Sequence, residues 1–294
     1  MPLSQIVSAS IEDGAVAPVD LSSVAQYTGF KNRLINGGFG IWQRGTSSTT
    51  NGVYATADRW LQVSGTSATW SRSTDVPSGF QYSMSVAGTN FPQVIQRIES
   101  VNCTDLASQD VTLSFWVKQA TPTPMAAYLQ YANATDNWTT STTIANSVLV
   151  LTGTTSWVKY SITVSAMPSQ SVNGLQVIIY ANTAGAATFL ITGVQLEKGV
   201  TATSFDYRPY GTELALCQRY YESTDALYST SSWATIANQA FWKVTKRTSP
   251  TIVNTPAAGS GGVYSPFQTG ITTVYQSSNN SVAAGGTLTG SAEL

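Results

Sequence analysis

The sequence contains no histidine, only two cysteines and few charges, and each shortage excludes a class of protein. Without histidine there is no His-assisted nucleophile, no His general base and no ordinary His-containing zinc site. Charged residues make up 10% of the chain, against roughly 25% in an average soluble domain. The formal net charge is −1 and no basic run occurs, so we expect no nucleic-acid partner.

Long apolar runs are also missing. Nothing in the chain approaches the ~20 consecutive apolar residues of a membrane-spanning helix. The first six residues, Met-Pro-Leu-Ser-Gln-Ile, lack the basic region and apolar run of a secretory signal peptide. We therefore expect a soluble chain with no membrane insertion and no export by a standard signal peptide.

The two cysteines, Cys103 and Cys217, lie far apart and form no CxxC pair. This spacing argues against a metal site or a redox pair. It favours two buried free thiols that act as small apolar residues, and a single disulfide between them stays open.

What the chain does contain is typical of β structure. Ser, Thr, Asn, Gln and Gly are plentiful, and aromatic residues reach 11% of the 294 positions. That length suits about two domains. Short segments separated by turn-forming residues predict around ten strands, at residues 59–63, 68–72, 81–86, 93–100, 111–118, 126–132, 147–151, 158–164, 175–181 and 188–197.

Several of these segments alternate between apolar and polar residues. In residues 111–118, Val111, Leu113, Phe115 and Val117 share one face, as the period of two in a strand requires. No amphipathic helix separates the strands, which argues against βαβ units. We predict an all-β fold in which residues 35–211 form a β-sandwich with hairpin or Greek-key connections.

Residues 1–34 predict an extended N-terminal arm. Their apolar positions follow neither a helical nor a strand period, and Asp13-Gly14 indicates a turn. We expect Ile6, Ile11, Val16 and Leu21 to dock on another chain, because exposed apolar residues in a monomeric arm would be a liability. The alternative is a disordered terminus.

A short connecting helix and a small β domain are predicted for residues 212–294. Thr212 would cap the helix, and Leu214, Cys217 and Tyr221 would share its inner face, with an end near Glu222. About 80 residues make a marginal domain, so we expect a homo-oligomer to supply a neighbour.

Six motifs together resemble a family of tailed-bacteriophage virion proteins, usually labelled tail fibres or minor structural proteins. Over residues 33–294, the motifs are Asn36-Gly-Gly-Phe-Gly-Ile-Trp-Gln-Arg-Gly-Thr46, Tyr54-Ala-Thr-Ala-Asp-Arg-Trp60, Leu113-Ser-Phe-Trp-Val-Lys118, Val194-Gln-Leu-Glu-Lys-Gly199, Arg208-Pro-Tyr-Gly-Thr-Glu-Leu-Ala-Leu-Cys-Gln-Arg-Tyr-Tyr221 and Gly290-Ser-Ala-Glu-Leu294. The resemblance implies a structural protein of the virion, assembled in the host cytoplasm. It also implies a homotrimer, attached to other virion proteins through the arm.

The sandwich is also similar in pattern to jelly-roll carbohydrate-binding modules, which open with Asn-Gly-x-Phe and close with a Gln-Leu-Glu strand. That likeness implies host-surface attachment by a non-enzymatic fibre, with no cofactor. One alternative is a dedicated glycan-binding receptor-recognition module. A less favoured alternative is a polysaccharide-cleaving tailspike.

Sugar recognition needs aromatic faces beside amide or carboxylate groups. The best local match is a polar loop with Tyr131, Asn133, Asp136, Asn137 and Trp138. The alternative is that Trp138 anchors this loop on the sandwich, because most tryptophans are largely buried.

The other tryptophans are expected in the core, except for one. Trp42, Trp60, Trp116 and Trp157 lie in apolar or motif contexts, whereas Trp70 stays undecided.

Charged residues give weaker indications. We expect Arg208 to pair with Glu197 or Asp206 at the domain boundary. A calcium site through Asn36 and Glu197 has little support, because no dense acidic pattern is present. Catalysis by two carboxylates has no predicted pairing, and the available candidates are Asp58, Asp75, Glu99, Asp105, Asp110 and Asp136.

Overall fold

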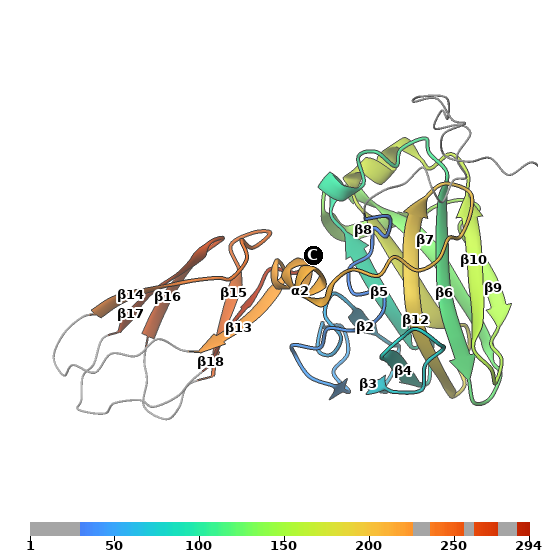
Figure 1. The fold of residues 1–294 in the computed structure, drawn as a ribbon, viewed down its shortest axis with the longest axis horizontal. Coiled ribbons are helices and arrows are strands. Elements are labelled where there is room, and N and C mark those ends of the chain that lie inside the picture. Colours follow the sequence, from blue (N-terminus) through green and yellow to red (C-terminus); the bar gives the residue numbers. More distant parts are fainter. Residues whose placement is uncertain (1–29, 226–235, 256–261, 276–286) are drawn as a thin grey trace, which may run out of the picture.

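The computed structural model describes residues 30–225, 236–255, 262–275 and 287–294. A β-sandwich and a smaller β region are joined through the helix α2 (Tyr210–Gln218), as Figure 1 shows. Strands make up most of the regular structure, so the predicted all-β class is confirmed. The four predicted docking residues of the arm, Ile6, Ile11, Val16 and Leu21, lie outside the described residues.

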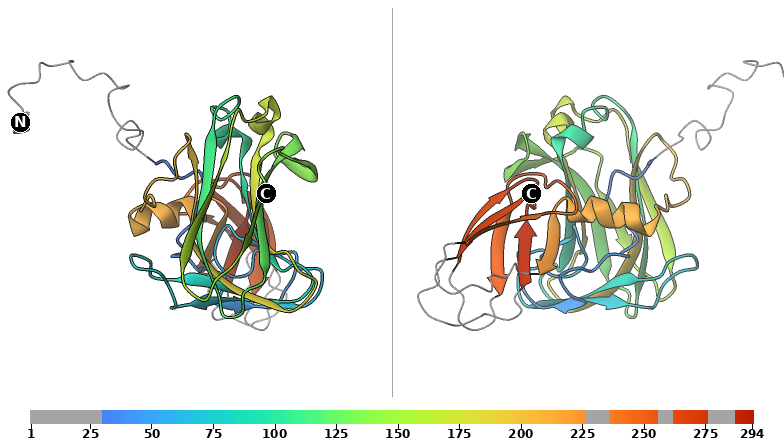
Figure 2. Two further views of the ribbon diagram at one scale, coloured as in Figure 1. Left: turned by 90° about the vertical axis from the view of Figure 1, so that its right-hand side faces the viewer. Right: turned by 60° about the vertical axis from the view of Figure 1, so that its left-hand side comes forward.

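Two antiparallel sheets form the sandwich, which Figure 2 shows from two further sides. Sheet A has the order β1 (Ser47–Ser48), β3 (Ala68–Ser73), β4 (Ser83–Gly88), β12 (Ala187–Lys198), β6 (Val111–Gln119) and β10 (Val158–Val164). Sheet B has the order β2 (Leu61–Val63), β5 (Gln93–Ile98), β11 (Leu175–Ala181), β7 (Pro124–Ala134) and β8 (Asn137–Thr143), and β9 (Leu149–Thr152) also pairs with β7. Each predicted strand range overlaps one of these strands, and two short 3-10 helices, η3 (Ser100–Asn102) and η4 (Ser169–Asn173), lie between them.

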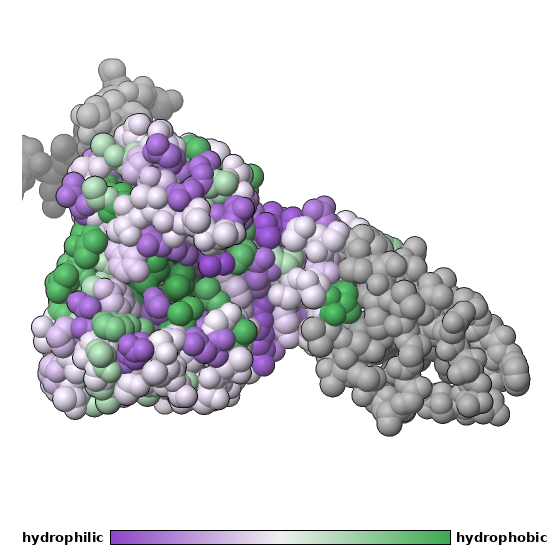
Figure 3. Space-filling model, turned by 180° about the vertical axis from the view of Figure 1, so that it is seen from behind, coloured by the Kyte–Doolittle hydropathy of each residue, from purple (hydrophilic) through white to green (hydrophobic). Residues whose placement is uncertain are grey.

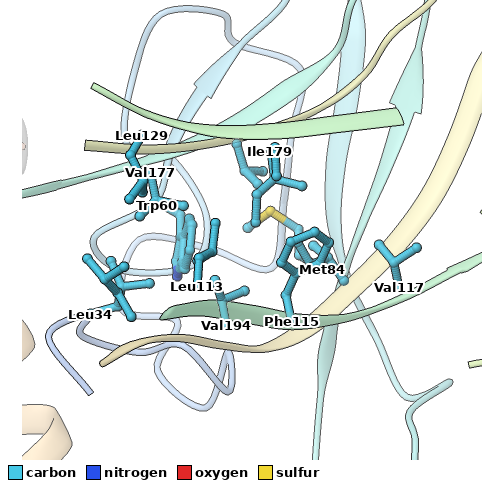
Figure 4. Packing of buried hydrophobic residues seen from close by; sticks show 14 of the residues in the cluster. Leu34, Trp60, Met84, Leu113, Phe115, Val117, Leu129, Val177, Ile179 and Val194 are labelled. Atoms are coloured by element: carbon cyan, nitrogen blue, oxygen red, sulfur yellow. The ribbon is translucent and has the colours of Figure 1, made fainter. Parts of the chain in front are cut away.

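The core lies between the two sheets. The four predicted inward positions of β6, from Val111 to Val117, are fully buried. Figure 4 shows Leu113 and Phe115 pointing across the sandwich toward Leu129 and Ile179 of the facing sheet. Alternation therefore predicted the buried face of this strand correctly.

In the motif that begins at Asn36, the asparagine side chain holds neighbouring chain segments together by hydrogen bonds. The side-chain amide of Asn36 donates to the carbonyl oxygens of Ile41 at 2.8 Å and Asp58 at 3.0 Å, and its oxygen accepts from the Ile41 N–H at 3.0 Å. The rings of Phe39 and Trp60 stack with centroids 5.0 Å apart, and the Trp60 indole donates to the Asn36 carbonyl at 3.0 Å. One buried asparagine thus ties two chain segments to the core.

The tryptophan predictions are correct for some positions and wrong for others. Trp60 and the undecided Trp70 are fully buried, and Trp42 packs half-buried against the core. Trp116 and Trp157 are only partly buried, so their assignment to the core was wrong. The reason for Trp116 is alternation, because its neighbours in β6 point inward and it must point outward.

Residues 32–34 already belong to the sandwich. Leu34 is fully buried in the core, and the Arg33 N–H donates to the carbonyl of Leu196 at 2.8 Å. The Asn32 side chain donates to the carbonyl of Val194 at 2.9 Å. The sandwich therefore begins before residue 35, where we drew the boundary of the arm.

The segment 199–209 folds back over the outer face of sheet A. The Asp206 N–H donates to the Gln195 side chain at 2.8 Å. Glu197 accepts hydrogen bonds from the N–H of Thr203 at 2.9 Å and from its hydroxyl at 2.6 Å. Because Gln195 and Glu197 point outward from β12 and are nevertheless buried, this segment closes their part of the face.

Arg208 fixes the start of the connecting helix. Its guanidinium lies 3.2 Å from Glu213 and 4.0 Å from Asp206, and it donates to the carbonyl of Leu34 at 3.1 Å. Of the two predicted partners, Asp206 is thus at the limit of ion pairing and Glu197 is not the partner. The main partner, Glu213, lies in the first turn of α2.

The helix differs from the prediction at both ends. Pro209 occupies the N-cap position, so α2 starts before Thr212, as a residue with a fixed φ permits at a helix start. At the other end Tyr221 pairs with Ser291 in a new strand, and this pairing ends the helix before Glu222. Among the described residues, no helix is long and apolar enough to cross a membrane.

In the residues that the structure describes, the small β region consists of two three-stranded sheets. One has the order β13 (Tyr221–Asp225), β18 (Thr287–Ser291) and β15 (Thr251–Thr255), and the other has β14 (Ile236–Phe241), β17 (Gly270–Tyr275) and β16 (Gly262–Phe267). A buried ion pair joins Lys246 to Glu222 at 2.6 Å, and Lys246 also donates to the carbonyl of Gln218 at 2.6 Å. This lysine therefore ties the region to the end of α2.

A cluster of charges joins the two parts of the molecule. Glu293 pairs with Arg44 at 2.7 Å and binds Arg59 through its other oxygen. The Arg59 guanidinium lies 3.5 Å from the ring centroid of Tyr220, and that of Arg44 lies 3.8 Å from the ring of Tyr221. The joint thus depends on the C-terminal segment as well as on the segment around α2.

Both cysteines are free and buried, which decides between the two alternatives. Burial raises the pKa of Cys103 to about 12 and raises that of Cys217 as well. Both thiols therefore stay protonated and pack as apolar groups.

Candidate functional site

The five predicted glycan-binding residues lie on a β-hairpin, not in a loop. Tyr131 and Asn133 belong to β7, Asp136 lies in the turn, and Asn137 and Trp138 begin β8. The sequence after the turn is rich in threonine, which favours strands, and it pairs with β7. Tyr131 packs against the core, while Asn133 and Asn137 are exposed.

The polar members of this set stabilise the hairpin. Asp136 accepts hydrogen bonds from the N–H of Ser100 at 2.8 Å and from its hydroxyl at 3.1 Å. Asn133 accepts from the hydroxyl of Thr142 at 2.7 Å, and Asn137 accepts from a backbone N–H two residues on, at 3.0 Å. These groups are thus engaged within the protein.

Trp138 has two roles in the structure. Its ring lies near Gly174, and the Arg97 guanidinium lies 5.3 Å from the ring centroid, so it anchors the hairpin on sheet B, as the alternative interpretation expected. Its indole N–H has no hydrogen-bond partner among the described residues. Since Arg97 points outward from β5, Trp138 also borders the outer face of sheet B.

That outer face carries an apolar row across four strands. Cross-strand pairing places Leu61 beside Ile95, Ile95 beside Ile178, and Ile178 beside Tyr128. These side chains point away from the core and form a second apolar cluster, in which Leu61 and Ile95 are 8% exposed and Ile178 is 2% exposed. The partly buried neighbours packed against it are Tyr54, Val63, Tyr128 and Tyr180.

The next row along the strands is polar. Arg97 pairs across the sheet with Gln176, Gln176 with Gln130, and Gln130 with Thr143. Their side chains are linked, since Arg97 donates to Gln176 at 3.3 Å, Gln176 donates to Gln130, and Gln130 donates to the Thr143 hydroxyl at 3.0 Å. The row thus presents amide and guanidinium groups along one side of the apolar row.

Tyr180 lies on the other side of the apolar row and contacts Tyr128, the last residue of that row. The rings of Tyr128 and Tyr180 meet edge to face with centroids 5.8 Å apart. Burial raises the pKa of Tyr128, with a smaller contribution from Tyr180, so its hydroxyl stays protonated at neutral pH. Figure 3 shows this side of the sandwich hollowed near its middle, with apolar residues in the hollow.

An apolar floor beside a polar row matches the chemistry of a sugar. Sugar rings have C–H faces that pack on aromatic rings and hydroxyls that bond to amides and guanidinium groups. Binding sites for small ligands combine mainly apolar surfaces with a few placed polar groups in the same way. The outer face of sheet B is therefore the candidate binding site.

Sequence reasoning missed most of this site. It identified Trp138 at the border, but not Tyr54, Tyr128 and Tyr180, which come from three separate strands or loops. A usable signal was present, because Tyr128 and Tyr180 occupy the outward positions of strands whose inward positions are aliphatic. A large aromatic at an outward position points to an occupied surface.

The outer face of sheet A offers less room. At Gly193 the chain has φ +62°, and a Cβ there would lie 2.6 Å from the ring of Phe80 and 2.9 Å from Trp116. Phe80, Phe205 and Tyr207 form a closed aromatic group with centroids 4.9–5.5 Å apart. This group and the segment 199–209 cover much of the face.

The carboxylates considered for catalysis each serve another group. Each of the six accepts a hydrogen bond or forms an ion pair within the protein. The partners are Gln43 for Asp58, Lys118 for Asp75, Arg219 for Glu99, Arg33 for Asp105, the N–H of Ala166 for Asp110 and Ser100 for Asp136. Within the described ranges, no group of three or more Asp, Glu or Cys residues could hold a metal ion. Asn36 and Glu197, considered for calcium, are hydrogen-bonded within the protein.

Asp58 should make stability depend on pH. Burial raises its pKa to about 6, against the opposing effect of Arg44. Because the folded state holds the proton more tightly than the unfolded state, the free energy of unfolding falls as pH rises from about 4 to about 6. A shift of about two units corresponds to about 3 kcal/mol.

We expect Asp58→Asn to remove this pH dependence. The difference in unfolding free energy between the wild type and the variant should change by about 3 kcal/mol between pH 4 and pH 7, in favour of the variant at the higher pH. Urea titrations at several pH values measure it. Parallel pH profiles for the two proteins would contradict the assignment.

No protein-family model and no curated protein sequence match the chain. Among solved structures, a putative sugar binding protein from Bacteroides thetaiotaomicron matches at 14% identity over 57% of this chain and 100% of its own, with a TM-score of 0.41. The enzymatically active domain of a tailspike protein from bacteriophage CBA120 matches at 14% identity over 57% of this chain and 21% of its own, with a TM-score of 0.41. A family 11 carbohydrate-binding module from Clostridium thermocellum, in complex with a β-1,3-1,4-mixed-linked tetrasaccharide, matches at 13% identity over 53% of this chain and 98% of its own. Its TM-score is 0.36. Matches at this level decide nothing about ligand, partner or activity.

Proposed function

We propose that this protein is a non-enzymatic bacteriophage virion protein, a fibre or fibre-like appendage, whose sandwich binds a glycan of the host surface. The observation that carries glycan binding is the outer face of sheet B, where a tyrosine-bordered apolar row runs beside the linked row from Arg97 to Thr143. The virion role is supported by the family resemblance of the sequence motifs. Residues 1–34 are proposed to attach the trimer to other virion proteins.

Glycan binding is tested on an array of bacterial surface polysaccharides and their fragments. We expect Tyr128→Ala and Tyr180→Ala each to weaken binding of the best-retained glycan at least tenfold, which is about 1.4 kcal/mol. The reason is that each change removes an aromatic ring from the face on which a sugar would pack. Isothermal titration calorimetry measures the loss.

Two control variants sharpen this test. Trp157→Ala removes a partly exposed aromatic outside sheet B and should leave the affinity within twofold. Asn133→Ala alters an exposed residue of the hairpin and should also have little effect. If Asn133→Ala abolished binding while the two tyrosine variants kept it, the hairpin and not the face would be the site.

The virion role has its own test. Antibodies against this protein should label intact particles in electron microscopy, and mass photometry of the full chain should give the mass of a trimer. Particles without label would contradict the virion role but not the glycan-binding face.

A further inference from the structure

One end of the outer face of sheet B is closed by the C-terminal segment. The carbonyl oxygen of Leu294 accepts hydrogen bonds from the Arg97 guanidinium at 2.6 Å and from the Tyr54 hydroxyl at 3.3 Å. Glu293, one residue earlier, is held by two buried arginines. The segment that follows β18 therefore forms a wall where β2 and β5 lie, next to the apolar row and the polar row.

The opposite end of the same face carries no tie of this kind in the described residues. On the outer side of β7, β9 pairs only as far as Ala127 and β8 pairs only from Gln130 onward. Neither strand pairs with Tyr128, the last residue of the apolar row. The segment between these two strands bonds to Leu129 through the N–H of Ile144 at 3.0 Å and the hydroxyl of Ser147 at 3.2 Å. Among the described residues, no hydrogen bond brings another segment to the side chain of Tyr128 as Leu294 is brought to Arg97.

We propose that this site takes a glycan by the end of its chain. A linear chain that lies along the apolar row from Tyr128 to Leu61 meets Tyr54 and Leu294 at the closed end and leaves freely past Tyr128. The wall thus admits a chain terminus and excludes an internal stretch, which would have to continue through it. The inference rests on the proposed glycan binding and adds the ligand class, which is the terminal few sugars of a linear chain.

The site also joins the two parts of the molecule. Leu294 comes from the small β region, whereas Arg97 and Tyr54 come from the sandwich. Burial lowers the pKa of Arg97, and its hydrogen bond to Leu294 holds the guanidinium beside Trp138. The C-terminal segment is therefore both a structural tie and a part of the binding surface.

The test uses the full chain and oligosaccharides of two to eight sugars from the best-retained linear polysaccharide of the array. These are immobilised either through the reducing end or through the other end. We expect at least tenfold stronger retention in one orientation, and an affinity that stops rising after the first few sugars. End recognition would be overturned by equal retention in both orientations, together with a number of bound protein molecules per polymer that rises in proportion to the length of the polymer. Glycan binding itself would still stand. Retention of no glycan at all would overturn the proposed function itself.

Deletion of Leu294 tests the wall directly. The variant keeps Glu293 and should remain folded, which an unchanged thermal midpoint checks. We expect the preference between the two orientations to fall to about twofold, because the closed end is opened. Tyr54→Phe, which removes one hydrogen bond to Leu294 and keeps the ring, should reduce the preference less. An unchanged preference in the deletion variant would overturn the assignment of the wall.

Discussion

Replacing Asn36 with alanine should lower the free energy of unfolding by about 3–5 kcal/mol. The backbone at Asn36 has φ +58°, a conformation that costs alanine about 1–2 kcal/mol. The substitution also leaves the N–H and carbonyl of Ile41 and the carbonyl of Asp58 without their partner, and each lost hydrogen bond costs about 1 kcal/mol net. Urea denaturation measures the loss.

A matched control separates the two causes. Asn146 also has a positive φ, of +61°, but its side chain is exposed. Asn146→Ala should therefore cost only the backbone part, about 1–2 kcal/mol. Similar losses in the two variants would show that the hydrogen bonds of Asn36 contribute little.

Replacing Glu293 with alanine should cost about 3–5 kcal/mol, because it leaves Arg59 buried without its carboxylate. The Arg59 side chain is 1% exposed and that of Arg44 is 8% exposed, so water reaches neither charge well. The loss should appear at the joint between the sandwich and the small β region. We expect earlier proteolytic cleavage near α2 as well as a lower urea midpoint.

The control for this prediction is an exposed ion pair. Asp105 pairs with Arg33 at 2.7 Å, and its side chain is 46% exposed. Asp105→Ala should change stability by less than about 1 kcal/mol, since exposed pairs are solvated when broken. A Glu293→Ala loss as small as this would mean that the arginines at the joint find other partners.

Local sequence patterns predicted those features of the fold that depend on a single strand. Alternation in β6 placed Val111 and Phe115 in the core, and the same rule should have placed Trp116 outside. The motif context of Trp116 predicted a core position, and that prediction was wrong. The hairpin was missed because β8 carries exposed threonines on both faces, so it has no apolar face to reveal its period.

The candidate site could not be found the same way. Ile95, Tyr128 and Ile178 look like ordinary alternating positions, and they are separated by at least 33 residues. They meet because β11 lies between β5 and β7. A shift of one residue in the pairing of β11 with β5 or with β7 would make the side chains of the shifted strand point toward the core.

By itself the sequence determined the all-β class, the approximate strands, the inward faces and the absence of histidine chemistry, because these depend on composition and on a period of two. The tertiary structure alone decided which outward residues share a face, that Asp136 serves the hairpin, and that Leu294 closes one end of sheet B. Those contacts join segments far apart in the chain, and strand order and register set them. No local pattern carries that information.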